Sequence, residues 1–219
     1  MERSRQRYGM LLLALGVTFF FEGVATPSDA ERTVRTALVG ATLLLALYAA
    51  ELSRRLLTAA AILVTISLAG VVIASIAGHG KTVEAIAGLV SAVLIALAPP
   101  AVVRGIVRNL RATGAVTVTV VAGALCLYLL VGLFFGALYV VIQNLGSGSF
   151  FSNGEPATTT HSLYFSFITM TTVGYGDFTP RTNLGRTLAA SEALLGQIYL
   201  VTVVAVIVGR MVPRRMAGH

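Results

Sequence analysis

Six apolar stretches, each about as long as a bilayer core is thick, make up most of this chain of 219 residues. A helix needs about 20 mostly apolar residues to cross the hydrocarbon layer. The six stretches lie at residues 8–25, 34–52, 56–77, 83–103, 115–142 and 185–209. Only 11% of the residues are charged, against about 25% in a typical soluble domain. The pattern predicts an all-α integral membrane protein without room for a soluble enzymatic or ligand-binding domain.

The basic residues are grouped in the short segments between these stretches, which give the chain its net charge of +7. In a six-span arrangement 11 of the 16 arginines and lysines lie on one side. The positive-inside rule assigns the richer side to the cytoplasm, so we expect both termini to be cytoplasmic. This grouping favours contact with membrane lipids and not with nucleic acid.

The N-terminal segment also resembles a cleavable signal peptide, because three arginines precede an apolar run that ends in the small residues 23–25. The run is long for a signal core, however, and it contains Glu22. A retained first span is therefore the favoured interpretation.

Between the last two stretches lies a shorter apolar run, residues 161–171. Eleven helical residues rise only about 16 Å, so this run enters the membrane and must return on the same side. Non-helical backbone is tolerated at membrane depth only where it is buried in protein or lines a water-filled path. We therefore expect a re-entrant pore helix, with the residues after Thr171 lining a pore.

The run is followed by Thr172, Val173, Gly174, Tyr175 and Gly176. Rings of backbone carbonyls from four chains replace the hydration shell of K⁺. Carbonyls that face one way require backbone angles that Gly174 and Gly176 adopt cheaply. We predict K⁺ sites at the carbonyls of the first four residues, with the Thr172 hydroxyl innermost and the Val173 and Tyr175 side chains pointing outward. One hairpin supplies a quarter of such a ring, so we expect a homotetramer.

The sequence from Thr169 through Asp177, with Pro180, resembles the signature of the potassium channel superfamily. The resemblance implies a potassium-selective pore in a prokaryotic plasma membrane, because Tyr175 stands where some non-selective relatives carry an acidic residue. It also implies a hydrogen bond behind the filter between Asp177 and an aromatic residue of the pore helix. The chain has no tryptophan, so Tyr164 is the candidate donor. Bound K⁺ is the expected cofactor, and no organic cofactor is expected.

Residues 191–200 resemble the inner helix of prokaryotic potassium channels, with Gly196 at the hinge position. Glycine weakens a helix by about 1 kcal/mol relative to alanine, but a close contact between helices explains Gly196 equally well. Helical spacing predicts four cavity-facing side chains: Gln197, Leu200, Val204 and Val208. Glu192 is expected to brace the pore helix, and its protonation to couple pH to the filter. The predicted filter supports are Asp177, Tyr164, Thr171 and Glu192.

Six spans with the pore last resemble the layout of voltage-gated channels, with a four-helix voltage-sensor-like domain at 1–112 and a pore domain at 113–219. The fourth stretch has no arginine through the membrane, and Pro99 and Pro100 are expected to break its helix. Three arginines follow in what we interpret as an amphipathic cytoplasmic linker: Arg104, Arg108 and Arg111. We predict a weakly voltage-dependent or voltage-independent channel. The alternative is genuine gating through these arginines.

Other functions fit the sequence less well. A potassium transporter subunit built from pore loops normally carries several in one chain, and this chain has one. A regulatory membrane subunit needs no intact filter. An enzyme is not expected, because the three histidines lie far apart without a nucleophile or metal-ligand spacing. Helical spacing also predicts that Glu51 pairs with Arg54 or Arg55. The gating stimulus stays open, as does the choice between domain-swapped and non-swapped packing.

Overall fold

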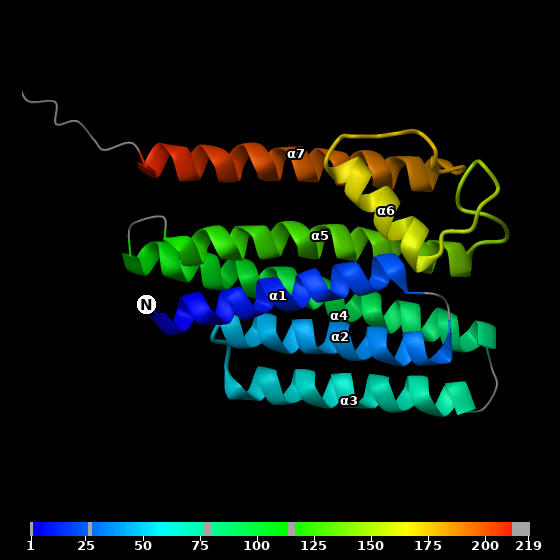
Figure 1. Ribbon diagram of the computed structural model, residues 1–219, viewed down its shortest axis with the longest axis horizontal. Coiled ribbons are helices and arrows are strands. Elements are labelled where there is room, and N and C mark those ends of the chain that lie inside the picture. The colour runs from blue at the N-terminus through cyan, green and yellow to red at the C-terminus, as the bar shows by residue number, and fades with distance from the viewer. Residues whose placement is uncertain (1, 26–27, 77–79, 114–116, 212–219) are drawn as a thin grey trace, which may run out of the picture.

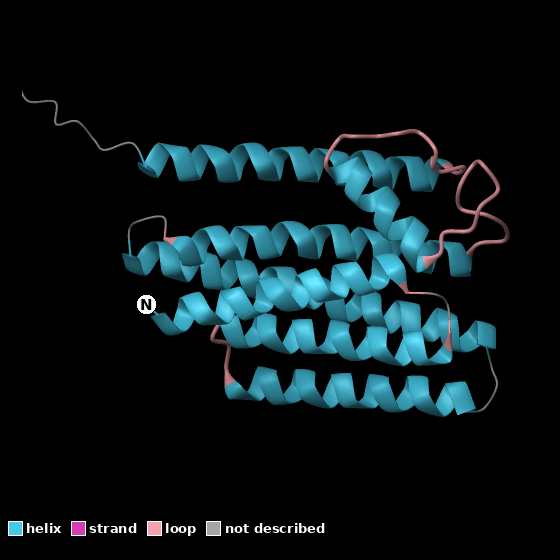
Figure 2. Cartoon of the chain, in the orientation of Figure 1, coloured by secondary structure: helices cyan, strands magenta, loops and turns pink. Residues whose placement is uncertain are grey.

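The computed structural model describes residues 2–25, 28–76, 80–113 and 117–211, and these ranges are almost entirely helical (Figures 1 and 2). The helices are α1 (Glu2–Val24), α2 (Asp29–Ala49), α3 (Arg54–Ile76), α4 (Gly80–Thr113), α5 (Val118–Leu145), α6 (Thr159–Met170) and α7 (Asn183–Met211). Six of them are long and apolar enough to cross a membrane, and α6 is the short one. The prediction of an all-α chain with six membrane helices is confirmed.

The six long helices lie side by side, and α6 lies obliquely between α5 and α7 at one end of the bundle (Figure 1). The start of α1 and the end of α7 are at the opposite end (Figure 1). Both therefore lie at the same end of the bundle. Among the described residues, α7 contacts only α5 and α6.

The main hydrophobic core runs without a break from the first four helices into α5 and α6. Its fully or almost fully buried members include Leu11 and Leu15 from α1, Leu43 from α2, Leu94 from α4, Leu130 and Leu133 from α5, and Leu163 from α6. The connection from Thr113 to Val118 is short, and α4 packs against α5 more extensively than any other pair of helices. The unit of the first four helices therefore packs on the α5–α6 part of its own chain through α1 and α4.

α4 continues from Gly80 to Thr113 through Pro99 and Pro100, so the expected break at these prolines is wrong. A proline removes one backbone donor, but neighbouring helices and local adjustment compensate for this inside membrane proteins. At 34 residues α4 is about 51 Å long, well beyond a hydrocarbon core of about 30 Å. Arg104, Arg108 and Arg111 thus lie on the last turns of this same helix and not on a separate linker.

Glu51, in the turn between α2 and α3, forms its ion pairs with residues that are distant in sequence. Its Oε1 atom lies 2.8 Å from Nη1 of Arg7, and its Oε2 atom lies 2.8 Å from Nη2 of Arg108. The predicted pair with Arg54 or Arg55 is wrong, because the turn carries Glu51 out of helical register with α3. Through these two pairs Glu51 connects Arg7 of α1 with Arg108 near the end of α4.

Candidate ion pathway

The short helix α6 is seated tightly on α5 by two glycines one turn apart. A side-chain carbon at Gly132 would lie 2.5 Å from the Phe167 ring, and one at Gly136 would lie 3.3 Å from the Leu163 backbone. Small residues at this spacing let two helices approach closely within a membrane. The helix begins after Thr158, whose hydroxyl accepts from the His161 amide at 3.2 Å. At the other end the Thr171 hydroxyl donates to the Phe167 carbonyl at 2.6 Å.

The segment Thr172–Gly176 leaves α6 with an alternating backbone. Thr172, Gly174 and Gly176 have φ values of 61°, 52° and 82°, whereas Val173 and Tyr175 between them do not have positive φ. Alternating handedness turns successive carbonyls toward one side of a strand, a backbone that α-helices and β-strands do not provide. The Gly174 amide donates to the Ile168 carbonyl at 3.1 Å and so ties the segment to α6. The sequence gives no signal for the positive φ of Thr172, which is uncommon for a β-branched residue.

Behind this segment, the Tyr164 hydroxyl donates to Oδ2 of Asp177 at 2.9 Å, which is the hydrogen bond that the resemblance implies. The rings of Tyr164 and Tyr175 stack almost parallel, with centroids 6.5 Å apart. Partial burial, followed by the hydrogen bond to Asp177, raises the pKa of the Tyr164 phenol above its usual value. The phenol therefore remains a donor at neutral pH.

Gln143, at the end of α5, organises the loop that leads into α6. Its Oε1 atom accepts from the amides of Phe150 at 2.8 Å and Ala157 at 3.0 Å, and its Nε2 atom donates to the Gly148 carbonyl at 2.9 Å. The loop is also tied to the chain after the segment, because Asn153 donates to the Asp177 carbonyl at 3.0 Å. Sequence reasoning missed Gln143, because its three partners are set by the fold of the loop and not by a motif.

Beneath the loop, a cluster of aromatic residues packs between α5 and α6. Its buried members are Phe135, Tyr139, Phe150, Phe151, Ala157 and Phe165. Many of these rings meet edge to face, an arrangement that favours one set of ring positions over others. The cluster gives the first half of α6 a rigid base.

Glu192 on α7 is completely buried and connects three helices. The Tyr139 hydroxyl of α5 donates to its Oε2 atom at 2.6 Å, and Ser166 of α6 is hydrogen-bonded to its Oε1 atom. The Ser166 oxygen also lies 2.7 Å from the Gly132 carbonyl oxygen. The predicted contact between Glu192 and this short helix is present, and it lies within one chain.

Gly196 lies where α7 comes closest to the end of α6. A side-chain carbon there would lie 2.7 Å from the Met170 carbonyl oxygen. Of the two explanations that the sequence leaves open, the structure supports a close helix contact. Leu200 and Val204 are exposed in the single chain, Gln197 is half-buried, and the side chain of Val208 lies outside the described residues. Arg104, Arg108 and Arg111 lie at the other end of the bundle from α6.

Parts of the chain are similar in sequence to known proteins. Residues 115–212 match the family model described as "Ion channel". A 47-residue segment is 53% identical to "Probable potassium channel protein 2" of Methanocaldococcus jannaschii, covering 20% of this chain and 14% of that protein. The matches support a potassium channel.

Two further relatives are also named as potassium channels. A 45-residue segment is 53% identical to human "Potassium voltage-gated channel subfamily KQT member 4", covering 20% of this chain and 6% of the relative. A 95-residue segment is 34% identical to "Inward rectifier potassium channel Kirbac3.1" of Paramagnetospirillum magnetotacticum. It covers 43% of this chain and 30% of that protein. The chain thus spans less than a third of the length of these relatives. No solved structure matches the chain significantly.

Proposed function

We propose that four copies of this chain form a potassium-selective channel that conducts K⁺ through the segment Thr172–Gly176. The observation that carries the proposal is the alternating backbone of this segment at the end of a helix too short to cross a bilayer. In a fourfold assembly, carbonyls turned to one side form stacked rings of oxygens that replace the hydration shell of K⁺. Thr172, Val173, Gly174 and Tyr175 supply these oxygens, and α6 is the re-entrant pore helix.

The homotetramer follows from the geometry of a single hairpin. One segment cannot surround an ion, and closed cyclic symmetry is the usual way for identical chains to complete a ring. The face of α7 that α5 and α6 leave uncovered supports this assembly. Its exposed apolar residues include Leu194, Leu195, Ile198, Val201 and Val204. In the tetramer this face packs on neighbouring subunits and lines the cavity, together with Gln197 and Leu200.

The first four helices form a voltage-sensor-like unit that responds weakly or not at all to voltage. Only a charge that moves across the membrane field contributes energy to voltage sensing, at about 2.3 kcal/mol per charge per 100 mV. Arg108 is paired with Glu51 at the end of the bundle, and the side chains of Arg104 and Arg111 are exposed there. The short α4–α5 connection supports a non-swapped tetramer, in which this unit packs on the pore helices of its own subunit. Both termini are cytoplasmic.

Reconstitution in planar lipid bilayers tests the proposal. With K⁺ on one side and Na⁺ on the other, a potassium-selective pore gives a reversal potential close to that of K⁺. Protein that reconstitutes but passes Na⁺ equally well contradicts the proposal.

A pair of glycine substitutions links the current to the filter backbone. Gly174 and Gly154 both have positive φ, at 52° and 89°, and both have open space where a side chain would lie. Alanine at either position costs about 1–2 kcal/mol of backbone strain. Gly174→Ala is expected to abolish K⁺ selectivity and Gly154→Ala, in the outer loop, to preserve it. If both alanine variants change K⁺ selectivity to the same extent, the assignment of Gly174 to the filter is contradicted.

A further inference from the structure

The first helix of the chain, α1, contacts α6 both at its first turn and near its end. The Thr160 hydroxyl donates to the Glu22 carbonyl of α1 at 3.2 Å. Two turns further along α6, the Phe167 ring meets the Phe19 ring of α1 edge to face, with centroids 4.8 Å apart. Residues seven apart lie on the same face of a helix. These contacts therefore attach one face of α6 to α1 over most of its length.

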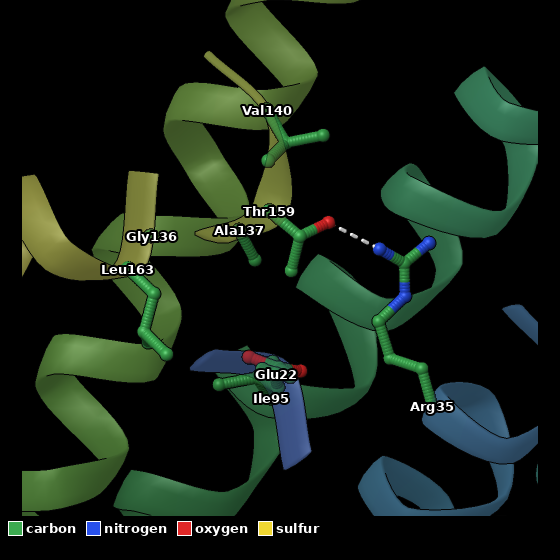
Figure 3. A pocket seen from close by; sticks show the side chains of 8 residues that line it. All are labelled: Glu22, Arg35, Ile95, Gly136, Ala137, Val140, Thr159 and Leu163. Carbon is green, nitrogen blue, oxygen red and sulfur yellow. Dashed lines mark hydrogen bonds between the residues drawn. The ribbon is translucent and has the colours of Figure 1, made fainter. Parts of the chain in front are cut away.

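The second helix, α2, reaches α6 through the long side chain of Arg35. The Nη1 atom of Arg35 donates to Oγ1 of Thr159, the first residue of α6 (Figure 3). Only 6% of the arginine surface is exposed. One turn earlier on α2, Oε1 of Glu31 lies 3.7 Å from the same Nη1 atom. The guanidinium is therefore held between its own helix and the first turn of α6.

This is an unfavourable place for an arginine that serves only to fill space. The N-terminal end of a helix carries a partial positive charge, which repels the guanidinium. Arg35 also lies on a helix long and apolar enough to span a membrane, where a charged side chain is costly and usually marks a functional contact. An apolar side chain would pack there at lower cost. The hydrogen bond to Thr159 therefore indicates a polar tether between α2 and α6.

The position of the first turn of α6 is passed on to the segment Thr172–Gly176 by the helix itself. Tyr164, in the second turn, donates to Asp177 after that segment at 2.9 Å. Ile168, one turn later, accepts from the Gly174 amide at 3.1 Å. Because a short helix moves as a rigid element, a tilt at its first turn would displace both of these contacts.

We propose that α1 and α2 form a clamp that fixes the tilt of α6, with Arg35 as its positioning residue. The clamp gives the first two helices a role that requires no movement of charge through the membrane field. Its effect on the K⁺ current rests on the proposed channel function, whereas the clamp itself does not.

Two substitutions at Thr159 separate a polar tether from packing. Thr159→Val keeps the shape of the side chain and loses the hydroxyl, whereas Thr159→Ser keeps the hydroxyl and loses the methyl group. Amide hydrogen exchange of α6 in protein embedded in lipid nanodiscs measures how often this helix opens. We expect exchange about tenfold faster than wild type in Thr159→Val, and within about twofold of wild type in Thr159→Ser. Wild-type exchange in Thr159→Val, or the reverse order of the two variants, overturns the clamp.

The control and the partner variant use the same measurement. The exposed Thr58 hydroxyl on α3 donates to the Arg55 carbonyl of its own helix at 2.9 Å, so Thr58→Val is expected to leave the exchange of α6 unchanged. Arg35→Met removes the other side of the tether. Its effect should be much smaller in Thr159→Val than in wild type, and effects that simply add overturn the pairing. If Arg35→Met fails to assemble, the two Thr159 variants decide.

The K⁺ current of reconstituted protein tests the consequence for the filter. We expect the current to decline several-fold faster in Thr159→Val than in Thr159→Ser. Equal rates of decline in two variants that differ in exchange overturn the link from the clamp to the filter. Wild-type protein that passes Na⁺ as well as K⁺ contradicts the proposed function instead, and the exchange result still decides whether the clamp exists.

Discussion

Glu192 offers the sharpest test of how α6 is held, because the donor of each of its hydrogen bonds can be assigned by counting protons. The Ser166 hydroxyl has one proton but lies within hydrogen-bonding distance of two oxygens, the Gly132 carbonyl and Oε1 of Glu192. The carbonyl only accepts, so Ser166 donates to it. We predict that Glu192 is protonated and donates to Ser166, so that each of the two contacts has its own proton; an ionised Glu192 would instead share the Ser166 proton with the carbonyl. Tyr139 donates to the other carboxyl oxygen and completes the chain.

Glutamine reproduces this pattern, because its amide nitrogen donates to Ser166 and its oxygen accepts from Tyr139. Glu192→Gln is therefore expected to change the free energy of unfolding by less than about 1 kcal/mol. Glu192→Ala leaves both hydroxyls without that partner, at about 1–1.5 kcal/mol each, and adds a cavity. The total cost is about 3–5 kcal/mol.

The assay is thermal dissociation of the solubilised tetramer, followed by gel electrophoresis together with the K⁺ current. Glu155 is an exposed glutamate in the loop before α6, and its Gln and Ala variants are the controls, with melting temperatures close to wild type. We expect Glu192→Gln to melt near wild type, and Glu192→Ala well below it. Any pH-dependent current that arises from Glu192 is expected to be absent in the glutamine variant. A glutamine variant as unstable as the alanine variant would refute the neutral hydrogen-bond chain.

Two further predictions concern the filter support and the voltage response. Tyr164→Phe removes the hydrogen bond to Asp177 and is expected to destabilise the conducting filter by about 1 kcal/mol. The K⁺ current should then decline about fivefold faster. The control, Tyr48→Phe on α2, is expected to leave the rate of this decline unchanged. Because the raised pKa of Tyr164 favours the neutral phenol, the wild-type bond persists below that pKa and is lost as the pH rises through it. Faster decline on the alkaline side should therefore occur in wild type and be absent in Tyr164→Phe; an identical alkaline response in both would rule out this bond. Replacing Arg104, Arg108 and Arg111 together by glutamine is expected to leave the slope of conductance against voltage unchanged, and a shallower slope would instead identify these arginines as the sensor.

The sequence by itself determined the number of helices long enough to span a membrane, the short helix before the last of them, and the positive φ of Gly174 and Gly176. These features are local, because about 20 apolar residues suffice to specify a span and a glycine specifies backbone freedom where it stands. The bond between Tyr164 and Asp177 was expected from the resemblance to potassium channels and is present in the structure.

Only the tertiary structure decided which distant side chains meet. Glu51 pairs with Arg7 and Arg108, which lie 44 and 57 residues away, and not with the arginines that helical spacing offers. Arg35 reaches Thr159 across 124 residues, and no local pattern marks either residue as its partner. Helix α4 persists through Pro99 and Pro100 because it packs on α2 and α5. The helix propensity of individual residues does not include such packing. Buried polar groups must find partners wherever the packed helices bring them, so their pairing is a property of the fold.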